Sequence, residues 1–381
     1  MRILLVGDYP PDPRLGSAKV LFKLQAEFRA LDHTCDLLLA DAIGGFPRRA
    51  LVRRGLAPLG ALRAVQRQFR ERGSYDVIDA ASAEGLWLAK LRGTALPRAA
   101  VVSRSNGLEH LDYQRMIDDH DAGLVHKPWT RRILHPAIRL SQVAAAARAA
   151  DRLLLLNEGD REFALAHRWK SADRIDVVPH GVSTRFIQEA PSGSEPRGGG
   201  ILFCSSWADV KGVSYLADAF ARLVRAGRQW KLTVVGGGRP RADILADFAA
   251  EARPFVTVLD RVAEDELMRA YRAHDVMVLS STYEGFGMVV IEAMSQRLPV
   301  VATPVGCAAS LIESGRTGLL VPTRDATALA EALDRMLTDG DLRERCAANA
   351  FPLVRDMTWS RTAALTLDVY RRALAPEADG R

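Results

Sequence analysis

Short strand-like runs alternate with amphipathic stretches along the first half of the chain. The runs, rich in Leu, Ile and Val, lie at residues 3–6, 35–40, 75–80, 99–103, 151–157 and 174–181. The stretches between them, such as 21–31 and 83–93, carry apolar residues at helical spacing. Apolar runs of this length are typical of strands buried on both faces. The alternation therefore predicts a parallel sheet covered by helices on both faces.

The pattern is interrupted at residues 190–200, where small, polar, Gly and Pro residues predict a linker or an exposed loop. It starts again at residue 201. The sequence therefore predicts an α/β fold with two Rossmann-like, doubly wound parallel-sheet domains that face a central cleft. The expected divisions are a first domain at 1–190, a linker at 191–200, a second domain at 201–357, and a helix at 358–381 that packs back onto the first domain. Function is expected at the carboxyl ends of the strands, where open α/β sheets bind ligands.

The composition is that of a globular protein large enough for two cores, with 381 residues, 48% hydrophobic and 26% charged. No apolar run reaches the roughly 20 residues of a membrane span, and the apolar run at the N-terminus is too short for a signal peptide. We therefore expect a cytoplasmic protein. The four cysteines form no CxxC pair and have no histidine at metal-ligand spacing, so neither a zinc site nor a disulfide framework is predicted.

The excess positive charge lies in the first half of the chain. Residues 1–190 carry 29 Lys and Arg against 22 Asp and Glu, whereas the remainder carries 23 against 24. The densest segment, residues 48–73, has eight arginines, one acid, and apolar residues at helical spacing. It is either a solvated helix face or a basic amphipathic surface that contacts an acidic acceptor or anionic lipid, peripherally at the inner face of the membrane. Nucleic acid is not expected as a partner, because no interleaved aromatic residues or binding motif accompany the arginines.

Two carboxylates flank a glycine-containing turn in STYEGFGMVVIEAMSQRLPVVATPVG, residues 281–306. Glu284 ends a predicted loop at 280–287, and Glu292 lies on the predicted helix at 288–296. Gly285 and Gly287 permit close backbone approach, and the amides at a helix start can bind phosphate. Carboxylates accept hydrogen bonds from hydroxyl groups. The stretch therefore predicts a nucleotide-sugar site, the alternative being two ordinary surface acids beside a tight turn.

This stretch resembles the E-x7-E signature of glycosyltransferase family 4 (group 1), a family of retaining enzymes with the GT-B fold. The EAM, PVVAT and GRTGLLVP segments also match, and the resemblance is specific from about residue 200 to residue 339. It implies that Glu284 holds hydroxyls of the donor sugar and that Glu292 holds the ribose. It also implies that the sugar and diphosphate are bound by the backbone of Gly285, Phe286, Gly287, Met288 and Val289.

The loop CSSWADVKG, residues 204–212, carries a second element of the resemblance. Lys211 resembles the family lysine that neutralises the diphosphate and supports the leaving nucleotide. A lone loop lysine is otherwise expected to be solvated. Relatives commonly have an arginine where this chain has Ser206, so another basic residue, or the backbone alone, must supply that charge beside the donor. In the family, the VVGGG turn containing Gly236 faces the nucleotide, and the segment with Arg261 lies beside the base; a glycine run otherwise simply ends a strand.

The first half matches the family more weakly. Gly16 and Ser17 precede a predicted helix, in the place of a family glycine loop that approaches phosphate; a plain turn is the alternative. Many relatives carry a histidine near the reacting carbon where this chain has Asn106. A histidine general base is therefore not expected, and Asn106 is expected to hydrogen-bond a sugar hydroxyl.

Four further residues are expected on the acceptor side. Arg104 ends a predicted strand, and Glu109 and His110 follow it, where they either contact the acceptor or orient the loop. His180, in a PHG turn, is either structural or in contact with ligand.

The resemblance implies a retaining, metal-independent, hexosyltransferase-like enzyme. Its catalytic residues would be Glu284, Lys211 and Asn106. It would move a sugar from a nucleotide-diphospho-sugar to a sugar or lipid-linked acceptor, in cell-envelope polysaccharide or glycolipid synthesis. No cofactor is expected, since there is no DxD motif in a suitable loop and backbone dipoles with a lysine can replace the charge of a metal. The alternatives are an inactive nucleotide-sugar-binding protein, an epimerase, or a phosphorylase of the same fold.

Overall fold

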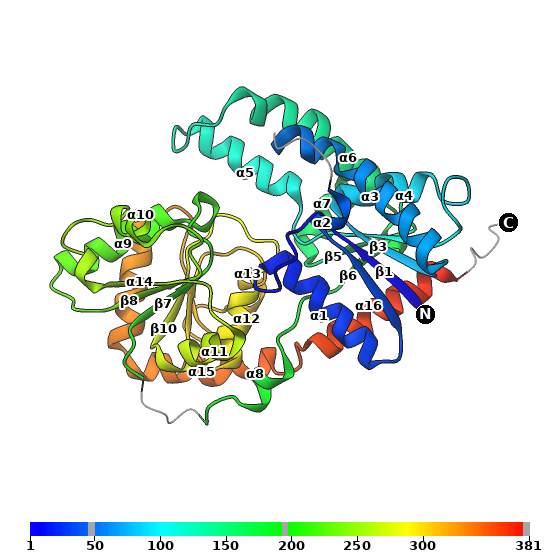
Figure 1. Cartoon of the computed structure of the whole chain (residues 1–381). Coiled ribbons are helices and arrows are strands. Elements are labelled where there is room, and N and C mark those ends of the chain that lie inside the picture. The colour runs from blue at the N-terminus through cyan, green and yellow to red at the C-terminus, as the bar shows by residue number, and fades with distance from the viewer. Residues whose placement is uncertain (45–49, 193–196, 376–381) are drawn as a thin grey trace. The chain divides into compact units, whose positions relative to one another are not determined.

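The chain forms two compact α/β units in the computed structural model, which describes residues 1–44, 50–192 and 197–375 (Figure 1). Unit 1 comprises Met1–His180 and Trp359–Arg381, and unit 2 comprises Gly181–Thr358. Each unit contains one parallel sheet of six strands within the described residues. The predicted fold class, two Rossmann-like α/β domains, is confirmed.

The sheet of unit 1 has the strand order β2-β1-β3-β4-β5-β6. Its strands are β1 (Arg2–Val6), β2 (Thr34–Leu38), β3 (Val77–Ala81), β4 (Ala100–Arg104), β5 (Arg152–Leu155) and β6 (Ile175–Val177). Its helices are α1 (Gly16–Ala30), α2 (Ala40–Ile43), α3 (Ala50–Arg72), α4 (Gly85–Lys90), α5 (Glu109–Asp121), α6 (Ser141–Ala149), α7 (Glu158–Ala166) and α16 (Trp359–Leu374). Shorter helical turns are η1 (Ser82–Glu84), η2 (Thr130–Leu134), η3 (Pro136–Leu140) and η4 (Ala172–Arg174).

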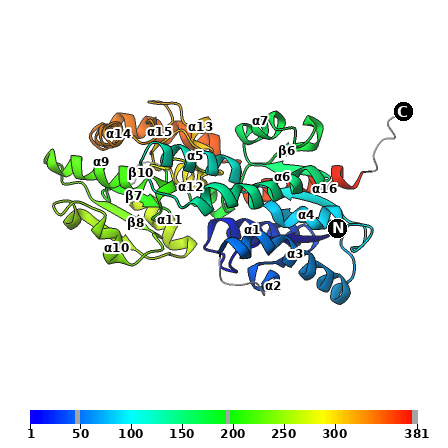
Figure 2. The same cartoon turned by 90° about the horizontal axis from the view of Figure 1, so that it is seen from above.

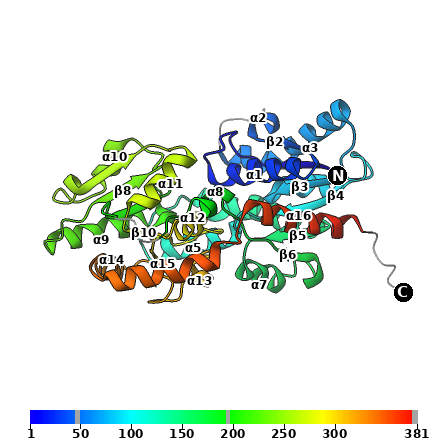
Figure 3. The same cartoon turned by 90° about the horizontal axis from the view of Figure 1, so that it is seen from below.

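Helices cover both faces of this sheet. On one face, α3, α4 and α6 pack together, and on the other α1 packs against α16. Figure 3 shows α16 in red beside the strands of unit 1, and its contacts with β4 and β5 establish that the C-terminal helix packs back onto the first sheet. Of the basic segment at 48–73, residues 48–49 lie outside the described residues. The rest contains the whole of α3, whose Val65 and Phe69 are buried in the unit 1 core while Arg63 and Arg70 are exposed.

The sheet of unit 2 has the order β12-β11-β10-β7-β8-β9. Its strands are β7 (Ile201–Cys204), β8 (Leu232–Val235), β9 (Val256–Leu259), β10 (Val276–Leu279), β11 (Val300–Ala302) and β12 (Leu319–Leu320). Its helices are α8 (Thr184–Gln188), α9 (Val213–Arg225), α10 (Arg241–Ala246), α11 (Glu264–Ala273), α12 (Met288–Ser295), α13 (Ala308–Leu311), α14 (Ala326–Thr338) and α15 (Gly340–Val354), with short turns η5 (Asp209–Lys211) and η6 (Arg253–Phe255).

The strands of unit 2 are continuous apolar runs, such as ILFC in β7 and VMVL in β10, and every residue of these two strands is buried. Helices α9 and α14 pack together over one face and share its core with the strands (Figure 2). Helix α12 contacts β10 and β11, and it also contacts α8 and α15. Burial on both faces explains why these strands do not alternate between apolar and polar residues.

The boundary between the units differs from the predicted one. It falls between His180 and Gly181 rather than at residue 190, and the predicted linker at 191–200 belongs to unit 2, with residues 193–196 outside the described ones. The reason is that α8 already packs in unit 2. The Phe186 ring lies 6.2 Å from that of Tyr271, and the Gln296 amide donates to the Phe186 carbonyl at 2.5 Å.

Candidate functional site

The two residues assigned to donor chemistry meet at the carboxyl edge of the unit 2 sheet. Strands β7 and β10 are neighbours, so the loops that follow them emerge side by side. Lys211 Nζ lies 2.7 Å from Glu284 Oε1, and Ser281 Oγ donates to the same oxygen at 2.7 Å. The Lys211 and Glu284 side chains are only 20% and 10% exposed. The arrangement is thus a half-buried cation and carboxylate rather than two solvated surface residues.

Backbone contacts fasten these two loops together. Gly212 has φ +63°, and a Cβ atom there would overlap the carbonyl oxygen of Ser280. Ser280 Oγ donates to the Lys211 carbonyl at 2.8 Å, and the Thr282 amide donates to the Val210 carbonyl at 2.9 Å. Glycine at position 212 therefore lets the two chains approach closely enough for Lys211 to reach Glu284.

The predicted turn and helix follow Glu284 as expected. Gly287 has φ +85° and immediately precedes Met288, the first residue of α12. Gly306, also at positive φ, leaves room for the Phe286 carbonyl, which accepts from the Cys307 amide at 2.6 Å. The first amides of an α-helix lack intrahelical acceptors. The start of α12 is therefore suited to an anion, and the binding of a phosphate there stays a prediction.

Glu292 lies on α12 with only 4% of its surface exposed. Tyr271, fully buried on α11, donates from its hydroxyl to Glu292 Oε2 at 3.0 Å. Cys204 lies in the same buried cluster, and burial, with the charge of Glu292, raises the pKa of its thiol. Tyr271 therefore holds one oxygen of Glu292 from the interior, a support that no motif indicated.

The remaining donor-side residues lie at the ends of β7, β8 and β9. Ser206 is exposed, and the amide of its neighbour Trp207 donates to the Gly237 carbonyl at 2.7 Å. Gly236 and Gly238 both have positive φ. An atom built at the Cβ position of Gly238 would lie 3.1 Å from Arg261 Nη2. The Arg261 guanidinium therefore lies beside the glycine turn that contacts the Ser206 loop.

A second polar cluster lies at the carboxyl edge of the unit 1 sheet. Tyr9 follows β1, Glu84 follows β3, and Asn106 follows β4. The strand order changes direction between β1 and β3, which is where open α/β sheets bind ligands. Asn106 Nδ2 lies 3.2 Å from the Tyr9 hydroxyl, while its Oδ1 is buried without a hydrogen-bond partner in the described part of the chain. Gly16 begins α1 at this same edge.

Arg139 holds this cluster together. Its Nη1 donates to Glu84 Oε1 and its Nη2 to Glu109 Oε1, each at 2.9 Å, and Ser82 Oγ donates to Glu109 at 2.5 Å. Burial raises the pKa of Glu84 despite the opposing charge of Arg139. Burial also raises the pKa of Glu109, but Arg139 and Ser82 together outweigh it, so the net pKa is lowered. Glu109 is therefore held by Arg139 and Ser82, an arrangement that favours loop orientation among its two predicted roles.

Arg104 does not lie on an acceptor-binding surface, contrary to the expectation from its sequence position. Its side chain is fully buried and its Nη2 lies 2.6 Å from Asp79 Oδ2, which also accepts from the Tyr370 hydroxyl at 2.5 Å. Tyr370 belongs to α16, so this ion pair is in contact with that helix. Arg104 is thus a structural residue that anchors the returning helix.

The two histidines considered for the acceptor side are packed against aromatic rings. The ring of His110 lies 4.7 Å from that of Trp169, and burial lowers its pKa to about 4. His180 is buried 5.5 Å from the Trp359 ring, where burial, helped by the charge of Arg104, lowers its pKa to about 3. Both are weak bases packed in aromatic surroundings, which favours the structural alternative for His180 and the loop-orienting alternative for His110.

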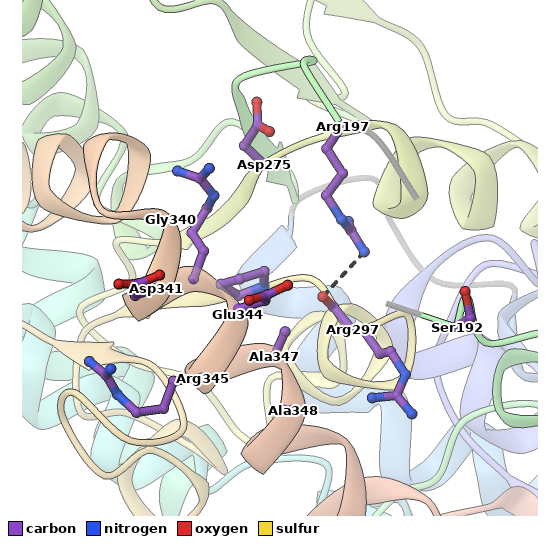
Figure 4. Close-up of a pocket in the computed structure, with 12 residues that line it drawn as sticks. Ser192, Arg197, Asp275, Arg297, Gly340, Asp341, Glu344, Arg345, Ala347 and Ala348 are labelled. Atoms are coloured by element: carbon purple, nitrogen blue, oxygen red, sulfur yellow. Dashed lines mark hydrogen bonds between the residues drawn. The ribbon is translucent and has the colours of Figure 1, made fainter. Parts of the chain in front are cut away.

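A pocket of about 980 Å³ in unit 2 includes none of the predicted residues (Figure 4). Arg197, Asp275 and Pro299 in its lining precede β7, β10 and β11, so it lies at the amino edge of the sheet. In Figure 4, Arg197 donates to the Arg297 carbonyl. Because ligands of such sheets bind at the opposite edge, this pocket is not the donor site. Among the described residues, no group of three or more His, Cys, Asp or Glu side chains is placed to hold a metal ion.

Comparisons with known proteins show which sequences and structures the chain resembles. Residues 198–339 match the family model described as Glycosyl transferases group 1. The chain is 36% identical over 154 residues to the alpha-D-kanosaminyltransferase of Streptomyces kanamyceticus. This match covers 40% of each protein. It is 33% identical over 259 residues to the D-inositol 3-phosphate glycosyltransferase of Nocardia farcinica, covering 64% of this chain and 54% of that one. The chain thus spans about half the length of these curated relatives or less.

Among solved structures, sucrose-phosphate synthase (tll1590) from Thermosynechococcus elongatus has a TM-score of 0.76 at 22% identity, with 97% of this chain and 98% of that chain covered. This likeness identifies the fold as GT-B. The family model spans β7 to α14, and it therefore contains Lys211, Glu284 and Glu292.

Proposed function

We propose that the protein is a retaining glycosyltransferase of family 4. Unit 2 binds a nucleotide-diphospho-sugar, and unit 1 binds a sugar or lipid-linked acceptor of cell-envelope polysaccharide or glycolipid synthesis. The observation that carries the proposal is the contact of Lys211 with Glu284 beside the start of α12. A half-buried cation, a carboxylate and helix-start amides together match the diphosphate and hydroxyls of such a donor.

Each group has a separate role in the proposed transfer. The bond between the anomeric carbon and the diphosphate oxygen breaks, and its electron pair leaves with the phosphate. Lys211 and the amides of 285–289 stabilise that charge, while Glu284 accepts hydrogen bonds from the sugar and Glu292 from the ribose. The acceptor hydroxyl adds to the same face of the sugar, and its proton passes to an oxygen of the departing phosphate. No metal ion takes part.

We further assign the missing second cation to Arg261. Its guanidinium lies beside the Gly236–Gly238 turn, and that turn accepts a hydrogen bond from Trp207, next to Ser206. Arg261 thus lies near the loop on which relatives place an arginine. Substitution of Arg261 with Met is expected to weaken nucleotide binding without loss of fold, because this side chain is exposed.

Lys211→Ala and Glu284→Gln test the proposal in an assay of nucleotide and glycoside release. Each variant is expected to lower kcat by about 100-fold or more, the usual cost of a lost transition-state contact. Lys231→Ala and Glu313→Gln, at exposed positions of unit 2, are the matched controls and keep activity. Unchanged turnover in Lys211→Ala would overturn the assignment.

The same assay separates the rival functions. A nucleotide-sugar-binding protein retains a donor-induced rise in Tm but releases no nucleotide with any acceptor or with water. An epimerase returns the donor with an inverted sugar centre and no free nucleotide. A phosphorylase forms sugar phosphate from inorganic phosphate. A screen of nucleotide sugars by thermal shift identifies the donor used in each case.

A further inference from the structure

The segment from Leu124 to Ile138, between α5 and α6, exposes large apolar side chains. Trp129 and Ile133 are each 61% exposed, the highest values among the large apolar residues of the described chain, followed by Leu124 at 51%; Ile138 is 38% exposed. Four of the eight exposed large apolar residues in the described chain therefore lie within one short segment. Such a concentration marks an interaction surface rather than ordinary surface variation. We call these four residues the apolar patch.

The apolar patch is held on a fixed support. The segment runs antiparallel to α5, and the two project from the sheet of unit 1 (Figure 1). Tyr113 on α5 donates from its hydroxyl to the Arg132 carbonyl at 2.7 Å, and its ring stacks on His135 at 6.1 Å. Residues 130–140 form two successive π-helical turns, an uncommon geometry that often marks functional sites. Spacings of four and five residues place Trp129, Ile133 and Ile138 along one stripe of these wide turns.

Positive charge accompanies the apolar patch. Arg131 and Arg132 are exposed between Trp129 and Ile133, and Lys127 precedes them, whereas residues 122–138 contain no Asp or Glu. Asp118 and Asp121 are exposed on the neighbouring end of α5, so the nearby acidic side chains lie on α5 and not on residues 122–138. Exposed Trp and aliphatic residues flanked by arginines are the combination that binds the interface of an anionic bilayer.

We propose that the apolar patch, with Arg131 and Arg132, docks the protein on the surface of an anionic phospholipid bilayer. Trp129 and Ile133 enter the head-group region, and the arginines contact lipid phosphates. A membrane contact was one of the alternatives that the sequence left open for the basic segment at 48–73. There, however, Val65 and Phe69 are buried in the core of unit 1, so these apolar side chains of α3 are not available to a membrane. No helix of the described chain is long and apolar enough to cross a membrane.

The test is flotation of the full chain, without donor or acceptor, with vesicles of phosphatidylcholine and phosphatidylglycerol or of phosphatidylcholine alone. The protein is expected to bind the anionic vesicles. Trp129→Ser combined with Ile133→Ser is expected to lower the partition coefficient at least about tenfold, because two apolar side chains no longer enter the interface. The matched control is Leu31→Ser combined with Leu353→Ser, two exposed leucines outside the apolar patch, which keeps wild-type binding.

Charge variants test the electrostatic part. Arg131→Gln with Arg132→Gln is expected to weaken binding to anionic vesicles, and Asp118→Asn with Asp121→Asn to strengthen it. Arg63→Gln with Arg70→Gln on α3 is the control and has little effect. The proposal is overturned if wild type does not float with anionic vesicles, or if only the α3 variant loses binding. It also fails if the Trp129 and Ile133 changes abolish only self-association in sedimentation velocity, which would assign the apolar patch to a second copy.

Discussion

Gly212 and Ser280 lie in such close contact that no side chain fits between them. They follow different strands, β7 and β10, yet a Cβ atom on Gly212 would overlap the Ser280 carbonyl oxygen. Ser280 in turn donates from its hydroxyl to the carbonyl of Lys211. The position of the Lys211 ammonium therefore depends on the glycine that follows it.

Substitution of Gly212 with Ala is expected to lower the free energy of unfolding by more than about 2 kcal/mol, since a strained positive φ is combined with a backbone overlap. Urea denaturation measures this loss in the free energy of unfolding. Gly227→Ala is the control, because Gly227 has φ +83° but no atom within 4 Å of its added Cβ, so only the cost of about 1–2 kcal/mol for backbone strain applies. Equal losses in the two variants would show that the loops separate without cost.

Replacement of Arg104 with Met is expected to destabilise the protein by about 3–5 kcal/mol, because Asp79 would remain buried without its cation. Arg98→Met, at an exposed position shortly before β4, is the control. Guanidinium denaturation compares the free energies of unfolding of the two variants. A higher KM for acceptor with unchanged stability would instead restore the acceptor-binding role that the sequence predicted for Arg104.

Asn106→Ala is expected to lower kcat/KM for the acceptor by about tenfold, the value of one lost hydrogen bond of roughly 1–1.5 kcal/mol. The physical reason is that Asn106 Oδ1 is buried without a partner in the described chain and is available to a hydroxyl. The donor-induced shift in Tm is expected to persist, because we assign donor binding to unit 2. Asn349→Ala, on the surface of unit 2, serves as the control. A loss of donor binding in Asn106→Ala would contradict the assignment.

Asp160, buried on α7, produces a pH dependence of stability. Burial raises its pKa to about 7 against an opposing hydrogen bond with Asn157. Below pH 3.8 the carboxyl is protonated in both states, whereas between pH 3.8 and about 7 only the unfolded chain ionises, so stability falls as the pH rises. Asp160→Asn is therefore expected to be more stable than wild type by roughly 4 kcal/mol at pH 8 and by little at pH 4.

Urea denaturation at the two pH values measures this difference. Glu162→Gln, at an exposed position of the same helix, is the control and leaves the pH dependence unchanged. A stability difference between Asp160→Asn and wild type that is equal at pH 4 and pH 8 would exclude the raised pKa of Asp160.

The sheets and the donor loop could be predicted from the sequence because their determinants are local. Apolar runs such as ILLV and VMVL specify strands buried on both faces. The loop from Ser280 to Gly287 carries its glycines and Glu284 within a few residues, and the structure brings Lys211 to it because β7 and β10 are neighbours. The catalytic roles of these residues remain predictions.

The unit 1 cluster could not be predicted in the same way. Tyr9, Glu84 and Arg139 are far apart in the chain and form no motif, and they meet only because β1, β3 and β4 end at one edge. The sequence alone also could not distinguish a buried Arg104 from an exposed one, since its partners Asp79 and Tyr370 come from another strand and from the returning helix.

The sequence by itself determined two parallel α/β sheets and a glycine-lined acidic loop. The spacing of apolar residues and the backbone freedom of glycine depend only on residues that are close together in the chain. Only the tertiary structure decided which charges are buried, which of them pair, and which apolar side chains remain exposed. Trp129 and Phe69 show the difference: both lie in basic, helical segments, but the core of unit 1 covers Phe69 and leaves Trp129 in contact with solvent. Burial depends on what packs against a residue, and that partner is set by the fold.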